Sequence, residues 1–374
     1  LIFTLILLMR FSLKWRKTKR KLLDSYHNCK AVNFKFYESQ KINFMKKLFL
    51  LTCTLLTLFS CTTDTSNLEI ENETISSLAK KGDSLVTNER NCASQDILEH
   101  ELKKNPELSL KIEKIEEFSK KVIIKDIFEI FPIRIEIPVV INVLYRTSAE
   151  NISSSQIQSQ IDALNQDFNG TNAEFNQVPG VFAGVKANVG IKFVLDRVIR
   201  IQTTRTEWSV LNEEMKKTAF GGIAPTSPTN KLNLWVCTLA GGILGYAKAP
   251  GTALELDGVV IDSRYFGTNG RATAPFHKGR TATHEIGHWL NVRHIWGDST
   301  CGNDLVSDTP SHNAANYGSP VFPHYSTCLG NPIEMTMNFM DYTNDVSMYM
   351  FTNGQRDRMR AQFLPGGYRY TFLQ

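Results

Sequence analysis

Three histidines and one glutamate stand close together in the stretch H-E-I-G-H-W-L-N-V-R-H, which runs from His284 to His294. Residues four apart share one face of an α-helix, so His284 and His288 can point at a common metal ion. Glu285 lies beside the first of these histidines, where its carboxylate can reach a metal-bound water rather than the metal. These residue types at this spacing are the ones that hold a zinc ion and activate a water on it.

The third histidine sets a condition on the backbone. Residues 281–290 have the periodicity of a helix, and His294 lies too far beyond His288 to share its helical face. The helix must therefore end and the chain must turn back sharply, which normally requires a residue in the left-handed conformation. Asn291 stands at this point, and asparagine tolerates that conformation best after glycine. We therefore expect a positive φ at Asn291.

The stretch resembles the zinc-binding signature of the metzincin peptidases, H-E-x-x-H-x-x-G-x-x-H, with Asn291 in place of the glycine. Metzincins also carry a methionine turn, and the run N-F-M-D-Y at residues 338–342 has the form typical of the pappalysin family. The resemblance to that family covers residues 137–374 and includes G-R-T at 279–281 and D-x-V-x-D-T-P at 304–310. It implies that Met340 forms an apolar floor under the metal. It also implies that Tyr342 helps to bind the reacting carbonyl oxygen.

The same resemblance implies an α+β metzincin fold. Such a fold has a twisted, mixed five-stranded sheet with a backing helix and an active-site helix, then an irregular C-terminal subdomain, and here a mostly helical prosegment precedes it. Apolar runs predict strands at residues 137–145, 191–195, 232–237, 243–247 and 258–261. A helix is expected after the serines at 153–155, with one apolar face made of Ile157, Ile161, Leu164 and Phe168. Gly245 and Tyr246 belong to the predicted edge strand, which can bind an extended peptide substrate by strand addition.

Charge and composition divide the chain into parts. The net charge is +5, but residues 1–60 hold 12 Lys/Arg and 2 Asp/Glu, which leaves 30 Lys/Arg and 35 Asp/Glu in the remainder. That acidic balance does not predict a nucleic-acid-binding surface. We expect four parts: an upstream extension (1–44), a lipoprotein-type signal peptide (45–60), a tether and prosegment (61–135), and a metzincin catalytic domain (136–374).

Residues 45–61 have the pattern of a bacterial export signal. Met45 and two lysines precede the apolar run 48–59, which is too short to span a membrane comfortably. L-F-S-C at 58–61 resembles a lipobox, in which Cys61 would carry the lipid, and the alternative is a plain cleaved signal peptide with Cys61 incidental. The protein is therefore expected to be exported, as a cell-surface or outer-membrane lipoprotein or in secreted form. Contact with a membrane is expected only through the signal peptide or the lipid anchor.

Further cysteines indicate a bridge and a latency device. Cys301 and Cys328 flank the polar loop after the histidines and form the natural disulfide pair of an exported protein. Cys92 follows Arg90 in R-N-C-A, ahead of a stretch with helical spacing that is interrupted at Pro106. A thiolate is a good zinc ligand, and an Arg-x-Cys element upstream of a zinc peptidase resembles a cysteine switch, which would hold the zymogen inactive. The alternative is a structural cysteine ahead of the helix.

Two acidic features follow the zinc motif. The loop after His294 contains oxygen ligands that suit calcium, namely Asp298, Asn303, Asp304, Asp308 and Thr309. Related pappalysins bind calcium in this region, so the resemblance implies Asp304, Asp308 and Thr309 as ligands; the alternative is a solvated acidic loop. Asp345 lies just past the methionine turn, where related enzymes build the S1′ pocket. A carboxylate there would favour Lys or Arg after the cleaved bond.

These features together predict a secreted zinc endopeptidase that is made as a cysteine-switch zymogen. Zn²⁺ held by the three histidines would activate a water, and Glu285 would act as general base in the hydrolysis of protein or peptide substrates. Two alternatives remain: a catalytically silent surface lipoprotein that uses the fold as a binding module, and a zinc hydrolase that acts on other substrates. The intact Glu285 argues against the first, because a structural zinc site does not need that carboxylate. The edge strand and the methionine turn argue against the second.

Overall fold

The computed structural model describes residues 88–122 and 134–373. The predicted upstream extension, the signal peptide and the lipidation site at Cys61 lie outside the described residues, as does most of the tether. Within the described ranges, no helix is both long enough and apolar enough to cross a membrane. Residues 88–122 are called the N-terminal segment below.

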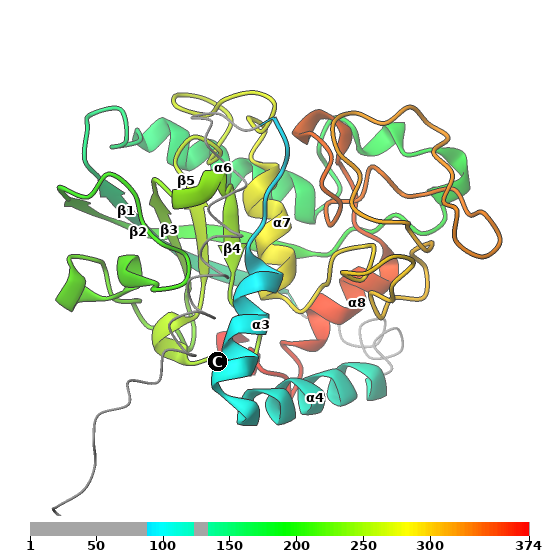
Figure 1. The fold of residues 1–374 in the computed structure, drawn as a ribbon, viewed down its shortest axis with the longest axis horizontal. Helices are drawn as coiled ribbons and strands as arrows, with labels where there is room; N and C mark the ends of the chain where they lie inside the picture. The colour runs from blue at the N-terminus through cyan, green and yellow to red at the C-terminus, as the bar shows by residue number, and fades with distance from the viewer. Residues whose placement is uncertain (1–87, 123–133, 374) are drawn as a thin grey trace, which may run out of the picture. The chain divides into compact units, whose positions relative to one another are not determined.

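A mixed five-stranded sheet forms the centre of residues 134–373, in the order β2-β1-β3-β5-β4 (Figure 1). Its strands are β1 (Ile135–Tyr145), β2 (Ile191–Gln202), β3 (Leu232–Cys237), β4 (Gly245–Ala247) and β5 (Val259–Asp262). β2, β1, β3 and β5 pair in parallel, and β4 runs antiparallel to β5 at the edge. The predicted mixed sheet is thus confirmed. β2 runs beyond its predicted end, because its pairing with β1 continues to Gln202.

Helices cover one face of this sheet. α6 (Ser154–Phe168) and α7 (Arg280–Trp289) contact each other and the strands. The Ser153 side chain caps α6 by accepting a hydrogen bond from a backbone N–H of its first turn, as the serine cluster predicts. Successive residues of a strand face opposite sides, so Leu234 of β3 joins the core under the helices and Trp235 joins a second apolar cluster on the other face.

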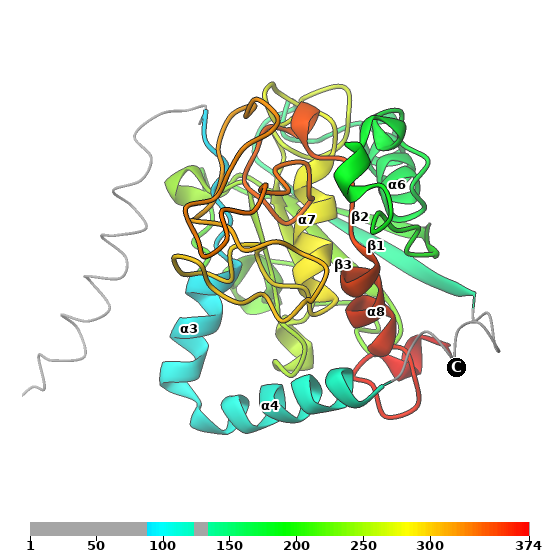
Figure 2. The same cartoon turned by 90° about the vertical axis from the view of Figure 1, so that its right-hand side faces the viewer.

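The chain after α7 is mostly irregular, as predicted. Figure 2 shows it as loops beside α7 that lead into α8 (Asn353–Ala361). A disulfide joins Cys301 to Cys328, which confirms the predicted pair, across a sequence separation of 27. The other short helical elements are 3₁₀ turns at Phe175–Gln177, Gly180–Phe182, Glu214–Lys216, Thr218–Phe220, Ala240–Gly242, Leu254–Leu256, Asp345–Ser347 and Tyr370–Leu373.

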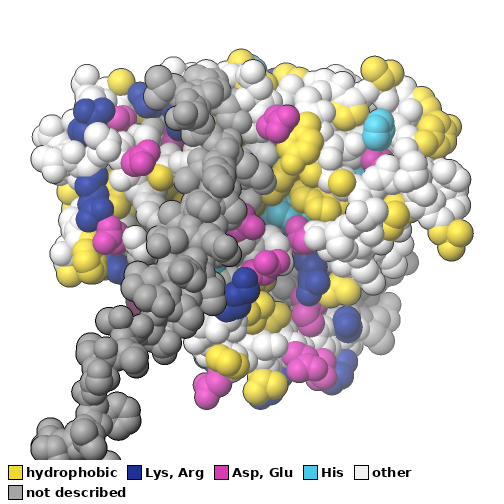
Figure 3. All heavy atoms as spheres, viewed as in Figure 1, with side chains coloured by type: hydrophobic (Ala, Val, Ile, Leu, Met, Phe, Trp, Pro, Cys, Tyr) yellow, Lys and Arg dark blue, Asp and Glu magenta, His cyan; other side chains and the backbone are white. Residues whose placement is uncertain are grey.

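The N-terminal segment forms two helices, α3 (Ser94–Lys104) and α4 (Pro106–Lys121). The break falls at Pro106 as predicted, because proline suits the first turn of a helix, and the Asn105 side chain caps α4. α3 contacts β4, and α4 contacts α8 (Figures 1 and 2). On the part of this face that is not grey in Figure 3, basic and acidic side chains are interspersed.

α7 ends sharply where the sequence requires a turn. The backbone N–H groups of Leu290 and Val292 donate to carbonyls of the last helical turn. Asn291 adopts a φ of 71°, in the left-handed region, which confirms the prediction. Its side-chain amide lies 3.5 Å from the Ser119 hydroxyl of α4, so the turn also contacts the N-terminal segment.

The left-handed turn gives a first prediction. Asn291→Ala and Asn291→Gly both remove the amide, but only alanine is strained at positive φ. We expect the alanine variant to unfold with a free energy about 1 kcal/mol lower than the glycine variant, as measured by urea denaturation. The matched pair at Asn169, which has a φ of −113° at the end of α6, should not favour glycine. Equal stability of the two Asn291 variants would contradict the strain.

Candidate metal centre

Three imidazole rings meet below the edge of the sheet. The Nε2 atom of His288 lies 3.2 Å from that of His284 and 3.0 Å from that of His294. The Cys92 thiol from the N-terminal segment joins them, and the four candidate ligand atoms lie within 4.8 Å of one another. Within residues 88–122 and 134–373, this is the one group of three or more His, Cys, Asp or Glu side chains whose ligand atoms converge in this way.

Hydrogen bonds orient each ring. The Nδ1 atom of His284 faces the Phe339 carbonyl at 2.7 Å, that of His288 faces the Val292 carbonyl at 2.9 Å, and that of His294 faces the Asp298 carboxylate. These oxygens can only accept, so each proton lies on Nδ1 and each Nε2 presents a lone pair. The lone pair on His288 Nε2 is repelled by those of the other two rings, at 3.2 and 3.0 Å, unless a cation lies between them. The donor set, three neutral imidazoles and one thiol, is the one that suits zinc.

Burial also favours neutral rings. Loss of hydration lowers the pKa of His288 to about 3 and places the pKa of His284 well below its usual value. Asp298 was placed by the sequence in the acidic loop that suits calcium, and in the structure its carboxylate contacts the third histidine. The sequence feature that could have indicated this contact is the position of Asp298 four residues after His294. Partners of this kind fix the tautomer and orientation of a metal-ligating histidine.

Met340 lies directly against α7. A Cβ atom placed on Gly287 would come within 2.4 Å of the Met340 sulfur, so glycine is required at this close approach. Met340 is fully buried, and its carbonyl accepts a hydrogen bond from the N–H of Ile295 at 3.2 Å. The methionine therefore packs against the helix that carries two of the histidines, and its role as a floor under the metal stays a prediction.

The Tyr342 ring packs against the imidazoles of the cluster. Its ring packs edge-on against His294, with ring centres 5.0 Å apart, and against Trp296 at 4.7 Å. Its hydroxyl donates to the backbone carbonyl of Cys92 at 3.3 Å. The hydroxyl can thus reach a peptide carbonyl that lies beside the metal-binding cluster.

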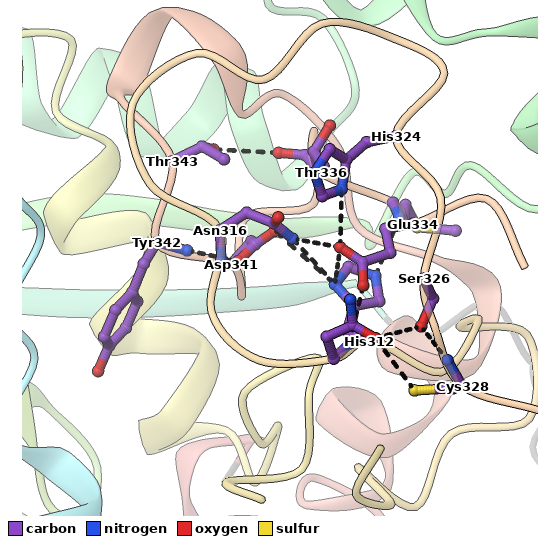
Figure 4. Close-up of polar contacts among 12 residues, drawn as sticks. His312, Asn316, His324, Ser326, Cys328, Glu334, Thr336, Asp341, Tyr342 and Thr343 are labelled. Carbon is purple, nitrogen blue, oxygen red and sulfur yellow. Dashed lines mark hydrogen bonds and ion pairs between the residues drawn. The ribbon is translucent and has the colours of Figure 1, made fainter. Parts of the chain in front are cut away.

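A buried polar network holds the backbone next to Tyr342 (Figure 4). One oxygen of the Asp341 carboxylate accepts the N–H of Tyr342 and the N–H of Asn316, both at 2.8 Å. The Asn316 amide also bridges Asp341, at 3.0 Å, to Glu334, at 2.8 Å. Burial raises the pKa of the Asp341 carboxyl to about 7. The sequence analysis missed these residues, because no local spacing links them.

Glu285 lies between the histidines and the edge strand. Its Oε2 atom accepts from the Ser94 hydroxyl at 2.8 Å and from the Cys92 thiol at 3.3 Å. Burial raises the pKa of the Glu285 carboxyl to about 7. A Cβ atom on Gly245 would lie 3.1 Å from Glu285 Cγ, so the strand passes close to this carboxylate. Ser94 was not identified from the sequence.

The N-terminal segment occupies the edge of β4. Residues 91–93 pair in parallel with the strand, through Leu244 N–H to the Asn91 carbonyl at 2.9 Å and Ala93 N–H to the Gly245 carbonyl at 3.2 Å. The Tyr246 side chain is buried and its hydroxyl contacts Glu213. Contacts of Tyr246 with an extended peptide are therefore limited to its backbone.

The Arg90 side chain is buried against Asp345. The two side chains form an ion pair at 2.6 Å and are 1% and 0% exposed. The guanidinium also donates to the Thr343 carbonyl and the Thr281 hydroxyl. The other Asp345 oxygen accepts the N–H of Lys278 at 2.7 Å, just before α7. Asp345 thus holds a guanidinium in this structure, and its role in an S1′ pocket stays a prediction.

The predicted calcium ligands Asp304, Asp308 and Thr309 make hydrogen bonds to one another or to the start of α8, and not to the histidines. Both oxygens of Asp304 accept from the Thr309 hydroxyl, at 3.0 and 2.8 Å, and burial raises the pKa of Asp304 to about 6. Asp308 accepts the N–H of Gly354 at 2.9 Å. These contacts join the loop to α8, and calcium binding stays a prediction.

Comparisons with known proteins agree with this geometry. Residues 230–364 match the family described as Peptidase_M43, pregnancy-associated plasma protein-A. An extracellular metalloprotease of Arthroderma benhamiae is 30% identical over 236 residues, which are 60% of this chain and 76% of that protein. Among solved structures, mature mirolysin of Tannerella forsythia in complex with a cleaved peptide is 41% identical, covers 64% of this chain and 96% of its own, and has a TM-score of 0.63.

A promirolysin mutant from Tannerella forsythia extends the likeness into the N-terminal segment. It is 37% identical, covers 76% of this chain and 97% of its own, and superimposes with a TM-score of 0.68. The sheet, its helices and the segment ahead of them therefore correspond to a metzincin with a prosegment. On the sequence likeness, the fold and the histidine cluster together, the chain belongs to the pappalysin family of zinc metallopeptidases.

Proposed function

We propose that this protein is the zymogen of an exported zinc endopeptidase, in which the N-terminal segment is a prosegment that blocks the active site. The observation that carries the proposal is the position of Cys92. Its sulfur completes the group of ligand atoms with the three histidines, within 4.8 Å, and also contacts Glu285 at 3.3 Å. A structural cysteine ahead of a helix would have no reason to contact both the metal ligands and the one acidic side chain beside them.

In the proposed peptide hydrolysis, the histidines, Glu285 and Tyr342 have separate roles. Zinc, when bound by His284, His288 and His294, lowers the pKa of a water and polarises a carbonyl. Glu285 takes up a proton from the nucleophile and passes it to the leaving amine. Its contact with the thiol supports this role, because it puts the carboxylate within hydrogen-bond reach of the place that Cys92 holds. The Tyr342 hydroxyl, which reaches a backbone carbonyl in the cleft, helps to hold the carbonyl oxygen.

Latency in this proposal has three parts. The Cys92 thiol holds the metal-facing position, residues 91–93 fill the edge of β4, and Arg90 fills the Asp345 pocket. The segment runs parallel to β4, whereas a peptide that pairs antiparallel would run in the opposite direction. Such a peptide would put the residue after its cleaved bond where Arg90 lies. The buried ion pair therefore supports a preference for Arg or Lys at that position.

The proposal also includes export of the protein, which its relatives support. The relatives of this chain are named extracellular metalloproteases. The alternatives of a silent binding lipoprotein and of a non-peptide hydrolase are less well supported, because Glu285 is retained beside the histidines and residues 91–93 of the chain itself pair with the strand edge. Lipidation of Cys61 and the calcium ligands Asp304, Asp308 and Thr309 stay predictions.

Removal of the general base tests the mechanism. After activation by trypsin, Glu285→Ala should cleave casein on the order of 10²–10⁴-fold more slowly, because proton transfer is lost. Zinc content by atomic absorption should stay at the wild-type level, since the histidines are untouched. Glu255→Ala changes an exposed glutamate away from the cluster and should keep full activity. Wild-type activity of Glu285→Ala would refute the proposed role.

Removal of the thiol tests latency. The unprocessed Cys92→Ala chain should cleave a short peptide at least on the order of tenfold faster than the unprocessed wild type, because a tenfold gain needs the loss of only about 1.4 kcal/mol of blocking interaction. Cys237→Ala removes the other buried free thiol among residues 88–122 and 134–373 and should remain latent. Intact mass measured before and after each assay ensures that processing does not account for the gain. Equal latency of both variants would leave Cys92 a structural residue.

Removal of the pocket charge tests specificity. Activated Asp345→Asn should lose at least about tenfold in kcat/KM on peptides with Arg after the cleaved bond, because a buried guanidinium would lose its countercharge. Peptides with Leu at that position should be cleaved as well as, or better than, by the wild type. Asp162→Asn, at an exposed aspartate of α6, serves as the control. An unchanged Arg to Leu ratio would exclude Asp345 as the determinant.

A further inference from the structure

Lys248, the residue after β4, carries a buried ammonium whose partners come from two parts of the chain. It forms an ion pair with Glu213 at 2.6 Å and a very close one with Glu101 of α3. The Lys248 side chain is 1% exposed, so both carboxylates shield it from water. Glu213 belongs to the body of the enzyme, whereas Glu101 belongs to the proposed prosegment.

The charges of this cluster balance only while α3 is in place. Lys216 also pairs with Glu213, at 2.8 Å, and it donates to the Leu256 carbonyl at 2.7 Å. Two ammonium groups thus face two carboxylates. The neighbouring Asp257 is engaged by the Arg369 guanidinium through both of its oxygens. Departure of α3 removes Glu101 and leaves Lys216 and Lys248 to share the single carboxylate of Glu213.

An ammonium without a full countercharge in such a place is costly, and it attracts another anion. Lys216 keeps its backbone partner and lies over the rings of Trp235 and Tyr246, so it loses nothing when α3 leaves. Lys248 loses one of its two partners. Departure of α3 therefore leaves a vacant anion position beside the Lys248 ammonium. That position fits a carboxylate, because the Glu101 carboxylate occupies it in the zymogen.

Lys248 lies along the same strand edge that residues 91–93 occupy, a few residues from the position opposite Cys92. It follows Gly245, the residue opposite Cys92, by three positions, which is roughly 10 Å along the strand. It lies toward the α3 end of the cleft, whereas the Asp345 pocket receives Arg90 from the other side of Cys92. The two ends of the cleft are therefore oppositely charged, with a cationic group at one end and an anionic group at the other.

We propose that Lys248 of the processed enzyme binds an acidic side chain of the substrate, on the N-terminal side of the cleaved bond. The direction follows from the pairing, because a peptide antiparallel to β4 would lay its N-terminal part where α3 lies in the zymogen. The inference rests on the proposed peptidase function. The substrates it defines are peptides with Asp or Glu before the bond and Arg or Lys after it.

Paired peptides test this proposal. The full chain is activated by trypsin, the trypsin is then blocked with a serine-protease inhibitor, and the zinc-loaded product cleaves fluorogenic peptides. These have Arg after the bond and either Glu or Gln at one of the second to fifth positions before it. At one position, kcat/KM should favour Glu over Gln by about tenfold, the size expected for one charged hydrogen bond. In Lys248→Met the ratio should fall to about one, while the Gln peptides are cleaved at the wild-type rate.

The control variant is Lys192→Met, which removes a half-exposed lysine from β2 at the opposite edge of the sheet and should keep the preference for Glu. A wild-type ratio near one at all four positions overturns the proposal, and so does a preference that survives in Lys248→Met. The wild-type ratio decides alone if Lys248→Met does not fold. Cleavage of no peptide by the wild type would instead refute the peptidase function, so the two failures are distinguishable.

Discussion

The approach of the His288 Nε2 lone pair to those of His284 and His294, at 3.2 and 3.0 Å, is the constraint on which the rest of the structure depends. Such an arrangement is unfavourable without a cation, so every ring must be held by a separate contact. The Phe339 carbonyl holds the His284 ring, and the Asp298 carboxylate holds the His294 ring. The left-handed Asn291 returns the chain so that the third ring can join the first two. The methionine turn, the end of α7 and the following loop are therefore parts of one metal-binding unit.

The N-terminal segment matches this unit contact by contact. It supplies a thiol beside the histidines, a guanidinium for Asp345 and a carboxylate for Lys248, each of opposite or complementary character to its partner. Because the segment is covalently attached, its effective concentration at the cleft is high and a free peptide competes poorly. In the proposed zymogen, the contacts that block the cleft also describe the proposed substrate that replaces them, so the same side chains would link regulation and specificity.

Much of the fold was predictable because its signals are local. The strand runs, the apolar face of α6 and the break at Pro106 follow from periodicity and from the backbone limits of proline. The predictions were less good where pairing partners decide the outcome. β2 continues past its apolar run because β1 continues beside it. Asp298 reads as one more oxygen ligand in an acidic loop, yet folding turns it toward His294.

The sequence by itself determined the candidate ligand set and the need for a turn at Asn291, since both depend on residue type and short spacing. The disulfide pair followed from two cysteines that flank one loop, and the fold class followed from the resemblance to the pappalysin family. Only the tertiary structure decided which charges meet. Arg90 and Asp345 are 255 residues apart, and Ser94 and Glu285 are 191 apart, so no spacing rule connects them. Buried charges and polar groups must find partners, but many acidic and basic residues of a chain could serve. Packing of α3 and α7 against the edge strand selects the pairs that form.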